Sequence, residues 1–82
     1  MAQFIDVHYG LHGVTQEELE AAHARDLDNE GAEGVHFERA WLDADSGQAF
    51  CLSTAPSKEA IMRVHEKSGI PVTEVHELTA QV

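Results

Sequence analysis

The sequence is poor in cysteine and in basic residues, and each shortage excludes a class of protein. A single cysteine, Cys51, rules out an intrachain disulfide framework and any Cys-x-x-Cys redox or metal motif. Five lysines and arginines against fifteen aspartates and glutamates give a formal net charge of −10. Because affinity for a nucleic-acid backbone is built from lysine and arginine contacts, we expect no nucleic-acid partner. The same charge disfavours an anionic membrane surface.

Long apolar stretches and the common catalytic motifs are also missing. No run approaches the roughly 20 apolar residues of a membrane span, and no basic segment followed by an apolar one marks a secretory signal. Glycine-rich phosphate-binding motifs, the G-x-S-x-G nucleophile elbow and the H-E-x-x-H zinc motif are all absent. We therefore expect a cytoplasmic protein without a membrane partner, and we predict no catalytic residues.

What remains is a short chain of ordinary composition with one unusual feature. Its 82 residues predict a single domain over residues 1–82, whose stability as a lone monomer would be marginal. Hydrophobic residues make up 43% and charged residues 24%, as in globular proteins. The unusual feature is the presence of six histidines among fifteen carboxylates.

Hydrophobic periodicity divides the chain into six predicted elements. Alternation with a period of two, typical of strands, occurs in four segments. They are residues 4–9, 35–42, 48–54 and 72–78. Helical spacing predicts helices over residues 15–29 and 56–67, the first opened by a capping box at Thr15. This β-α-β-β-α-β order predicts a ferredoxin-like α+β fold, with sheet order 4-1-3-2 and both helices on one face.

The same alternation assigns side chains to the two faces of the sheet. Phe4, Asp6 and His8 share one face of the first strand. We expect Phe4, together with Trp41 and Leu78, to lie on the face that no helix covers. A small acidic chain with a half-apolar open face most simply buries that face against a second copy, so we predict a homodimer.

Paired histidine and carboxylate side chains are the chemical signal of this sequence. Asp6 and His8 share a face of the first strand, and Glu74 and His76 share a face of the last, its predicted neighbour. With Cys51 of the strand on the other side, we expect these residues to converge on the open face. Imidazole and carboxylate suit borderline divalent ions such as Ni²⁺, Zn²⁺, Co²⁺ and Cu²⁺. The alternative is that they are polar residues of a solvated sheet edge or a dimer interface.

Five further positions are candidate metal ligands. His36 and Glu38 form a third pair on one strand face. Glu20 and His23 have the E-x-x-H spacing that places both on one helix surface, and Asp26 continues it three residues later. A solvated charged face has the same appearance. His12 lies in a glycine-flanked loop.

For two residues, Cys51 and His65, the sequence also favours a purely structural role in the core. Cys51, next to Leu52 in a predicted strand, has the setting of an inert buried thiol. His65 follows Ile61 by four residues in the second helix, a spacing that indicates a half-buried structural histidine.

Five blocks of sequence, taken together, resemble a family of small proteins of unknown function that is common in actinobacteria. They are M-A-Q-F-I-D-V-H (residues 1–8), V-T-x-E-E-L-x-x-A-H (residues 14–23), the strand around Trp41, F-C-L-x-x-A-P (residues 50–56) and V-H-x-x-x-G (residues 64–69). One branch of that family is described as nickel-responsive or nickel-binding. The resemblance implies a ferredoxin-like dimer and, for the nickel branch, Ni²⁺ held at the dimer surface for sequestration or detoxification.

The leading hypothesis is therefore a non-enzymatic, homodimeric protein that binds divalent metal, with nickel preferred. The alternative, by analogy of fold, is a small cofactor-free oxygenase or isomerase. Its apolar cavity would contain His8, Trp41, Cys51 and His65. A third possibility is an interaction module, whose sign would be an apolar patch left exposed after dimerisation.

Overall fold

The computed structural model describes residues 1–82 and has the predicted order of elements. The strands are β1 (Ala2–His8), β2 (His36–Asp43), β3 (Gln48–Ala55) and β4 (Glu74–Leu78). The helices are α1 (Gln16–Glu30), the short 3-10 helix η1 (Gly31–Glu33) and α2 (Lys58–Lys67). None of these helices is long and apolar enough to cross a membrane.

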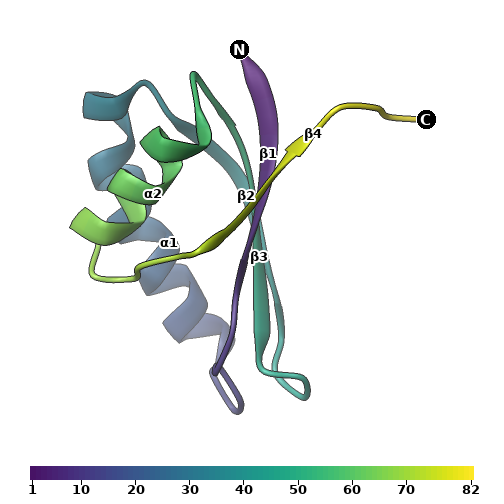
Figure 1. Cartoon of the computed structure of the whole chain (residues 1–82). Helices are drawn as coiled ribbons and strands as arrows, with labels where there is room; N and C mark the ends of the chain where they lie inside the picture. Colours follow the sequence, from purple (N-terminus) through teal and green to yellow (C-terminus); the bar gives the residue numbers. More distant parts are fainter.

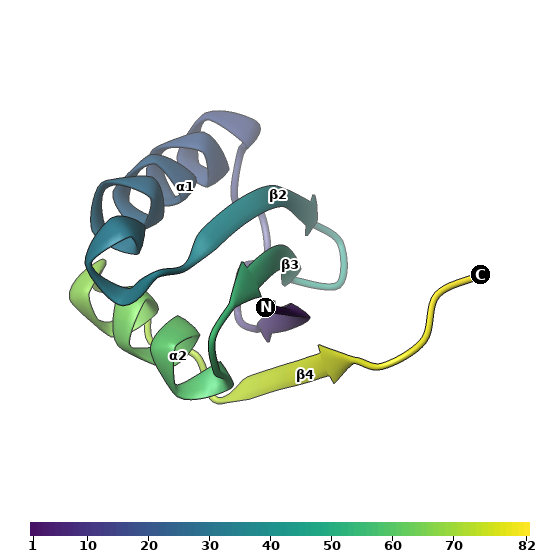
Figure 2. The same cartoon turned by 90° about the horizontal axis from the view of Figure 1, so that it is seen from above.

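The four strands form one antiparallel sheet in the order β2-β3-β1-β4, which is the predicted order read from the opposite edge. Both helices lie on the same side of this sheet (Figure 1). Seen from above, α1 and α2 run side by side and leave the other face of the sheet without a helix (Figure 2). The predicted ferredoxin-like α+β architecture is confirmed.

Local capping explains where the two helices begin. The predicted capping box of α1 is present: the Glu18 amide donates to the Thr15 hydroxyl, and the Glu18 carboxylate accepts from the Thr15 amide. For α2, the Ser57 hydroxyl accepts from the Ala60 amide at 3.2 Å. That serine cap starts the helix at Lys58, two residues later than its expected start.

The core lies between the helices and the sheet. Its buried apolar members are Phe4, Val35, Phe37, Cys51, Ala55, Ala60, Ile61 and Val64. The expectation that Phe4 lies on the uncovered face is wrong, because Phe4 is 3% exposed in this core. Asp6 and His8 share its side of β1, so they too face the helices.

A β-bulge between Phe37 and Arg39 changes the pattern of β2. Phe37 pairs with Ser53, whereas Arg39 pairs with Leu52, its immediate neighbour on β3. The extra residue, Glu38, turns Phe37 into the core and Trp41 to the opposite face of the sheet.

The face without helices is apolar at its centre. Strand register places on it Ile5, Val7, Trp41, Phe50, Leu52 and Leu78. Trp41 and Leu78 remain 46% and 41% exposed. Their predicted position on the uncovered face is confirmed.

Ile61 and its neighbour Met62 allow a test of this packing. Ile61 is fully buried and Met62 is 36% exposed. We expect Ile61→Ala to lower the free energy of unfolding by about 2–4 kcal/mol, because it removes buried methyl groups and leaves a cavity. Met62→Ala should lower it by less than about 1 kcal/mol. Urea unfolding followed by circular dichroism measures both, and equal losses would contradict the position of the core.

Candidate metal centre

A buried histidine between two carboxylates joins three elements of the fold. The α2 helix directs His65 inward, and its ring is fully buried. Its Nδ1 lies 3.0 Å from Asp26 Oδ1 of α1, and its Nε2 lies 3.2 Å from Asp6 Oδ2 of β1. Because both nitrogens face carboxylate oxygens, both must carry a proton to donate, which is the imidazolium form.

The carboxylates change the acidity of His65. Burial alone would lower the pKa of the imidazole, but the hydrogen bonds to Asp26 and Asp6 and their negative charges outweigh it and raise the pKa to about 9. At neutral pH the ring is therefore charged and paired on both sides. A buried charge is tolerated in a protein when it is paired and hydrogen-bonded in this way.

Asp6 also faces a second histidine. His8 Nε2 lies 2.8 Å from Asp6 Oδ1, and the two form an ion pair when the imidazole is protonated. The rings of His8 and His65 meet edge to face at 4.7 Å. Burial favours the neutral form of Asp6, but contacts with His65 and His8 outweigh it and lower the pKa of this carboxyl.

Cys51 completes the cluster from the neighbouring strand. It is the register partner of Asp6 across the β1–β3 pair, so both side chains point toward the helices. Burial raises the pKa of the Cys51 thiol, and the negative charges of Asp6 and Asp26 raise it further. In the metal-free protein Cys51 is therefore a neutral thiol and a poor nucleophile.

Asp6, His8, Cys51 and His65 together form a group of four possible metal ligands. One ligand atom from each lies within 4.8 Å of the others, and all four residues are buried. We call these four residues the buried tetrad. It holds two imidazole nitrogens, one carboxylate oxygen and one sulfur, a mixture suited to borderline divalent ions rather than to Ca²⁺ or Mg²⁺.

The structure separates the residues that were expected to converge on the open face. Asp6, His8 and Cys51 do come together, but on the helix-covered face. Glu74 and His76 pair with Val7 and Ile5, so they lie on the opposite face of the sheet. The predicted five-residue convergence is wrong, because a two-residue period says which side chains share a face and not which face is covered. Glu74 and His76 do form their own exposed contact, 3.0 Å long.

The third predicted strand pair is also divided. His36 is exposed, with Nδ1 3.6 Å from Glu30 Oε1 at the end of α1. Glu38 lies in the bulge and accepts a hydrogen bond from Gln3 instead of meeting His36.

The helix and loop candidates stand apart from the tetrad. Glu20 is exposed and accepts a hydrogen bond from Gln16. His23 is half-buried, and its Nδ1 has no hydrogen-bond partner. His12 is exposed and packs against Gly47, where an added Cβ would lie 2.7 Å from its ring.

Two members of the observed network, Asp26 and His65, were not among the predicted metal ligands, and His65 was named only for the cavity of the alternative enzyme. His65 was expected to be half-buried and structural, yet it is fully buried and lies at the centre of the network. A signal was present in the sequence: His65 occupies a position of the apolar stripe of α2, and a histidine buried there requires polar partners.

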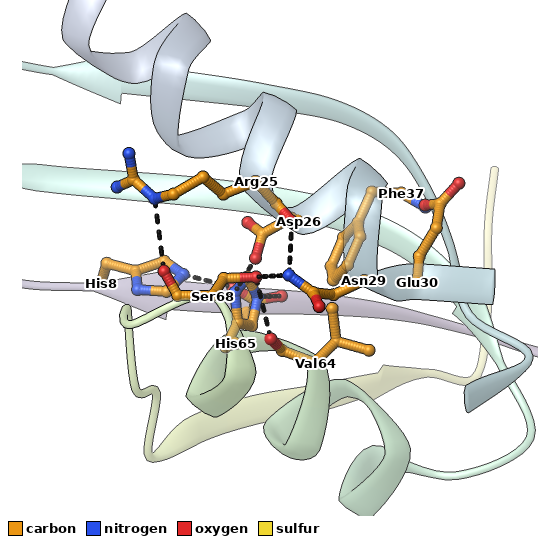
Figure 3. Close-up of polar contacts among 10 residues, drawn as sticks. His8, Arg25, Asp26, Asn29, Glu30, Phe37, Val64, His65 and Ser68 are labelled. Carbon is orange, nitrogen blue, oxygen red and sulfur yellow. Dashed lines mark hydrogen bonds and ion pairs between the residues drawn. The ribbon is translucent and has the colours of Figure 1, made fainter. Parts of the chain in front are cut away.

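Further hydrogen bonds fix α1 against the end of α2 around this network (Figure 3). The Arg25 guanidinium donates from Nε to the Ser68 carbonyl at 3.3 Å, and the Asn29 amide donates to the Ser68 hydroxyl. That hydroxyl in turn donates to the Val64 carbonyl at 2.9 Å. The helices that carry Asp26 and His65 are thus held in a fixed relation.

Two comparisons with known proteins each cover nearly all of the chain. The family described as "Nickel responsive protein SCO4226-like" matches residues 4–78. The crystal structure of SCO4226 from Streptomyces coelicolor A3(2) is similar, with a TM-score of 0.96 at 49% sequence identity over 99% of this chain and 100% of that one. None of the curated proteins matches this chain.

The shift in the pKa of His65 predicts how stability depends on pH. A group whose pKa is raised on folding stabilises the fold fully below its unfolded value, here 6.5, and loses that contribution as pH rises through about 9. We expect the free energy of unfolding to fall by on the order of 2–3 kcal/mol across this window. Urea unfolding at each pH measures it.

The matched control is Asp26→Asn, which removes one carboxylate and keeps the shape. In this variant the decline above pH 6.5 should be smaller, because less of the shift in the pKa of His65 remains. An identical decline in both proteins would mean that groups other than His65 cause it.

Proposed function

The chain belongs to the family of nickel-responsive proteins similar to SCO4226, and from this premise we propose that it binds Ni²⁺ and withholds it from other ligands in the cell. The observation that carries the proposal is the buried tetrad, whose four ligand atoms lie within 4.8 Å of one another. The ion is cargo, and the role is sequestration or detoxification rather than catalysis.

The tetrad suits this cargo in the chemistry of its donors. Imidazole and thiolate bind ions of the nickel, zinc, cobalt and copper group better than they bind hard ions. Asp6 Oδ1 is buried, and His8 Nε2 lies 2.8 Å from it. A cation bound at these two atoms would take the place of a proton between them and keep both atoms paired.

A cavity supplies a route to the tetrad from solvent. It lies between α1 and the sheet, and both His8 and Cys51 line it. An ion can therefore reach two of the four ligands without separation of the helices from the sheet.

Exposed histidine–carboxylate pairs support a second, weaker mode of binding. Glu74 with His76, and His36 with Glu30, each offer two donors at the surface. An ion there completes its coordination with water or with donors of a second molecule. Added Ni²⁺ would then link protein molecules into larger assemblies, as the exposed candidates His12, Glu20, His23 and Glu38 would also allow.

Calorimetric titration of tag-free protein tests the proposal. We expect saturable Ni²⁺ binding with a whole number of sites, and only heat of dilution with Mg²⁺, because nitrogen and sulfur donors do not suit that ion. Titrations with Zn²⁺, Co²⁺ and Cu²⁺ give the order of preference. Heat of dilution alone with every transition metal would overturn the proposed function.

Two variants of the tetrad and one outside it locate the site. His8→Ala and Cys51→Ser should each weaken the tightest Ni²⁺ binding about tenfold or more, and Cys51→Ser should abolish any thiolate-to-metal absorption band. His12→Ala is the control, because His12 is exposed and outside the tetrad. If His12→Ala weakens binding and the tetrad variants do not, the ion binds at the surface instead.

We also propose that the protein is a homodimer joined through the uncovered face of the sheet. The support is the apolar centre of that face, where Trp41 and Leu78 are large and still exposed. Isologous contact of two such faces would bury them without any new element. For a chain of 82 residues, the added burial would supply stability that one copy lacks.

Light scattering tests the dimer. We expect a mass of about twice 9.0 kDa for the native chain. The double variant Trp41→Glu and Leu78→Glu should be monomeric, because it places charges in the interface. Met62→Glu, on the helix side, should remain dimeric. A native protein that is monomeric at micromolar concentration, or a dimeric double variant, would refute this interface.

A second candidate function, a small cofactor-free oxygenase or isomerase, is favoured only by the cavity between α1 and the sheet. His8 and Cys51 line this cavity as that hypothesis expected. His65 lies behind them within the network, and Trp41 lies on the other face of the sheet. The neutral Cys51 thiol gives no activated nucleophile, so the cavity supports binding of a small molecule more directly than it supports a reaction.

A further inference from the structure

The cavity between α1 and the sheet is a built feature of the fold. Its volume is about 220 Å³, and it opens to solvent beside the exposed side chains of Glu18 and Arg25. The apolar part of its wall consists of Leu11, Val14, Leu19, Ala22, Ala49, Cys51 and Ile70. The polar part consists of His8, Glu18, Arg25 and Asp26.

The loop over the cavity is tied in place before any ligand arrives. The Leu11 amide donates to the Gly47 carbonyl at 2.9 Å, and the Gly13 amide donates to the Ala44 carbonyl at 3.4 Å. These bonds fasten the β1–α1 loop to the turn between β2 and β3. A cavity whose wall is already ordered binds a ligand without the entropic cost of ordering a loop.

The size of the cavity sets the size of its occupant. An apolar cavity of about 150 Å³ holds a benzene molecule. A cavity of about 220 Å³ therefore accommodates one aromatic ring with a side chain of two or three further atoms. The apolar wall would contact the ring, and the polar groups would meet the end of the side chain.

The charged residues of the cavity wall determine which polar group the ligand would carry at the end of its side chain. Glu18 and Asp26 contribute two carboxylates, and Arg25 contributes one guanidinium whose Nε already donates to the Ser68 carbonyl. Asp26 is 3% exposed and uses Oδ1 to hold His65, so Oδ2 remains as an acceptor. A buried carboxylate with a free acceptor favours a cationic donor and disfavours an anion.

From this shape and charge we propose that the cavity binds a small primary amine with a single aromatic ring, its ammonium group on the Asp26 carboxylate and its ring against the wall formed by Leu19, Ala22 and Ile70. His8 and Cys51 of the tetrad also line this cavity, but binding of the amine requires no metal.

Phenethylamine is the probe, titrated into native protein that has been freed of metal with a chelator. Chemical-shift changes in the amide spectrum report its binding. We expect saturable shifts around the cavity and an affinity about tenfold or more above that of 3-phenylpropionate, which has a similar body and the opposite charge. Absence of saturable binding, or equal binding of the carboxylate, overturns the proposal.

Two substitutions place the amine in this cavity. Ala22→Phe should abolish binding by filling the space, whereas Ala21→Phe, exposed on the same helix, should leave it unchanged. Asp26→Asn should remove the preference for the amine over the carboxylate even where the ring still binds. Binding to Ala22→Phe at the native affinity, or an unchanged preference in Asp26→Asn, contradicts the proposal. Because no metal is present, none of these outcomes depends on whether Ni²⁺ binds.

Discussion

The doubly paired imidazolium of His65 is the interaction on which the interior of this protein depends. It joins α2 to α1 through Asp26 and to β1 through Asp6, over sequence separations of 39 and 59 residues. Loss of one partner would leave a buried charge without its counterpart, which costs far more than loss of an exposed pair. The other tetrad residues lie around this arrangement, and its partner Asp26 also lines the cavity.

Periodicity was sufficient to predict the fold and insufficient to orient it. Alternation placed Phe4, Asp6 and His8 on one side of β1, and that grouping is confirmed. Phe4 was expected on the uncovered face as part of its apolar surface, and Asp6 and His8 were expected there as metal ligands. All three face the helices instead, where Asp6 contacts His65. A polar side chain in the core is predictable only when its partner is known, and this partner lies in another element.

The remaining differences have local causes that a single sequence hides. One inserted residue, Glu38, reverses the alternation of β2, and nothing in its composition marks the bulge. Asp26 belongs to a helix whose residues are otherwise half-buried or exposed. In the sequence it therefore cannot be told apart from the solvent-exposed acidic residues of the same helix. Only the packing of α1 against α2, fixed by Arg25, Asn29 and Ser68, shows that it points inward.

Charge balance would allow this one cluster to serve both as a structural brace and as the proposed site for a divalent ion. In the metal-free protein, Asp6 and Asp26 surround one proton-bearing imidazolium, and Cys51 keeps its own proton. A divalent ion bound to the tetrad would replace one proton of His65 and the proton of Cys51, two positive charges for two. The net charge of the buried group would be the same before and after. Since the net charge dominates the free energy of a dry site, this exchange avoids the penalty that a simple addition of charge would incur.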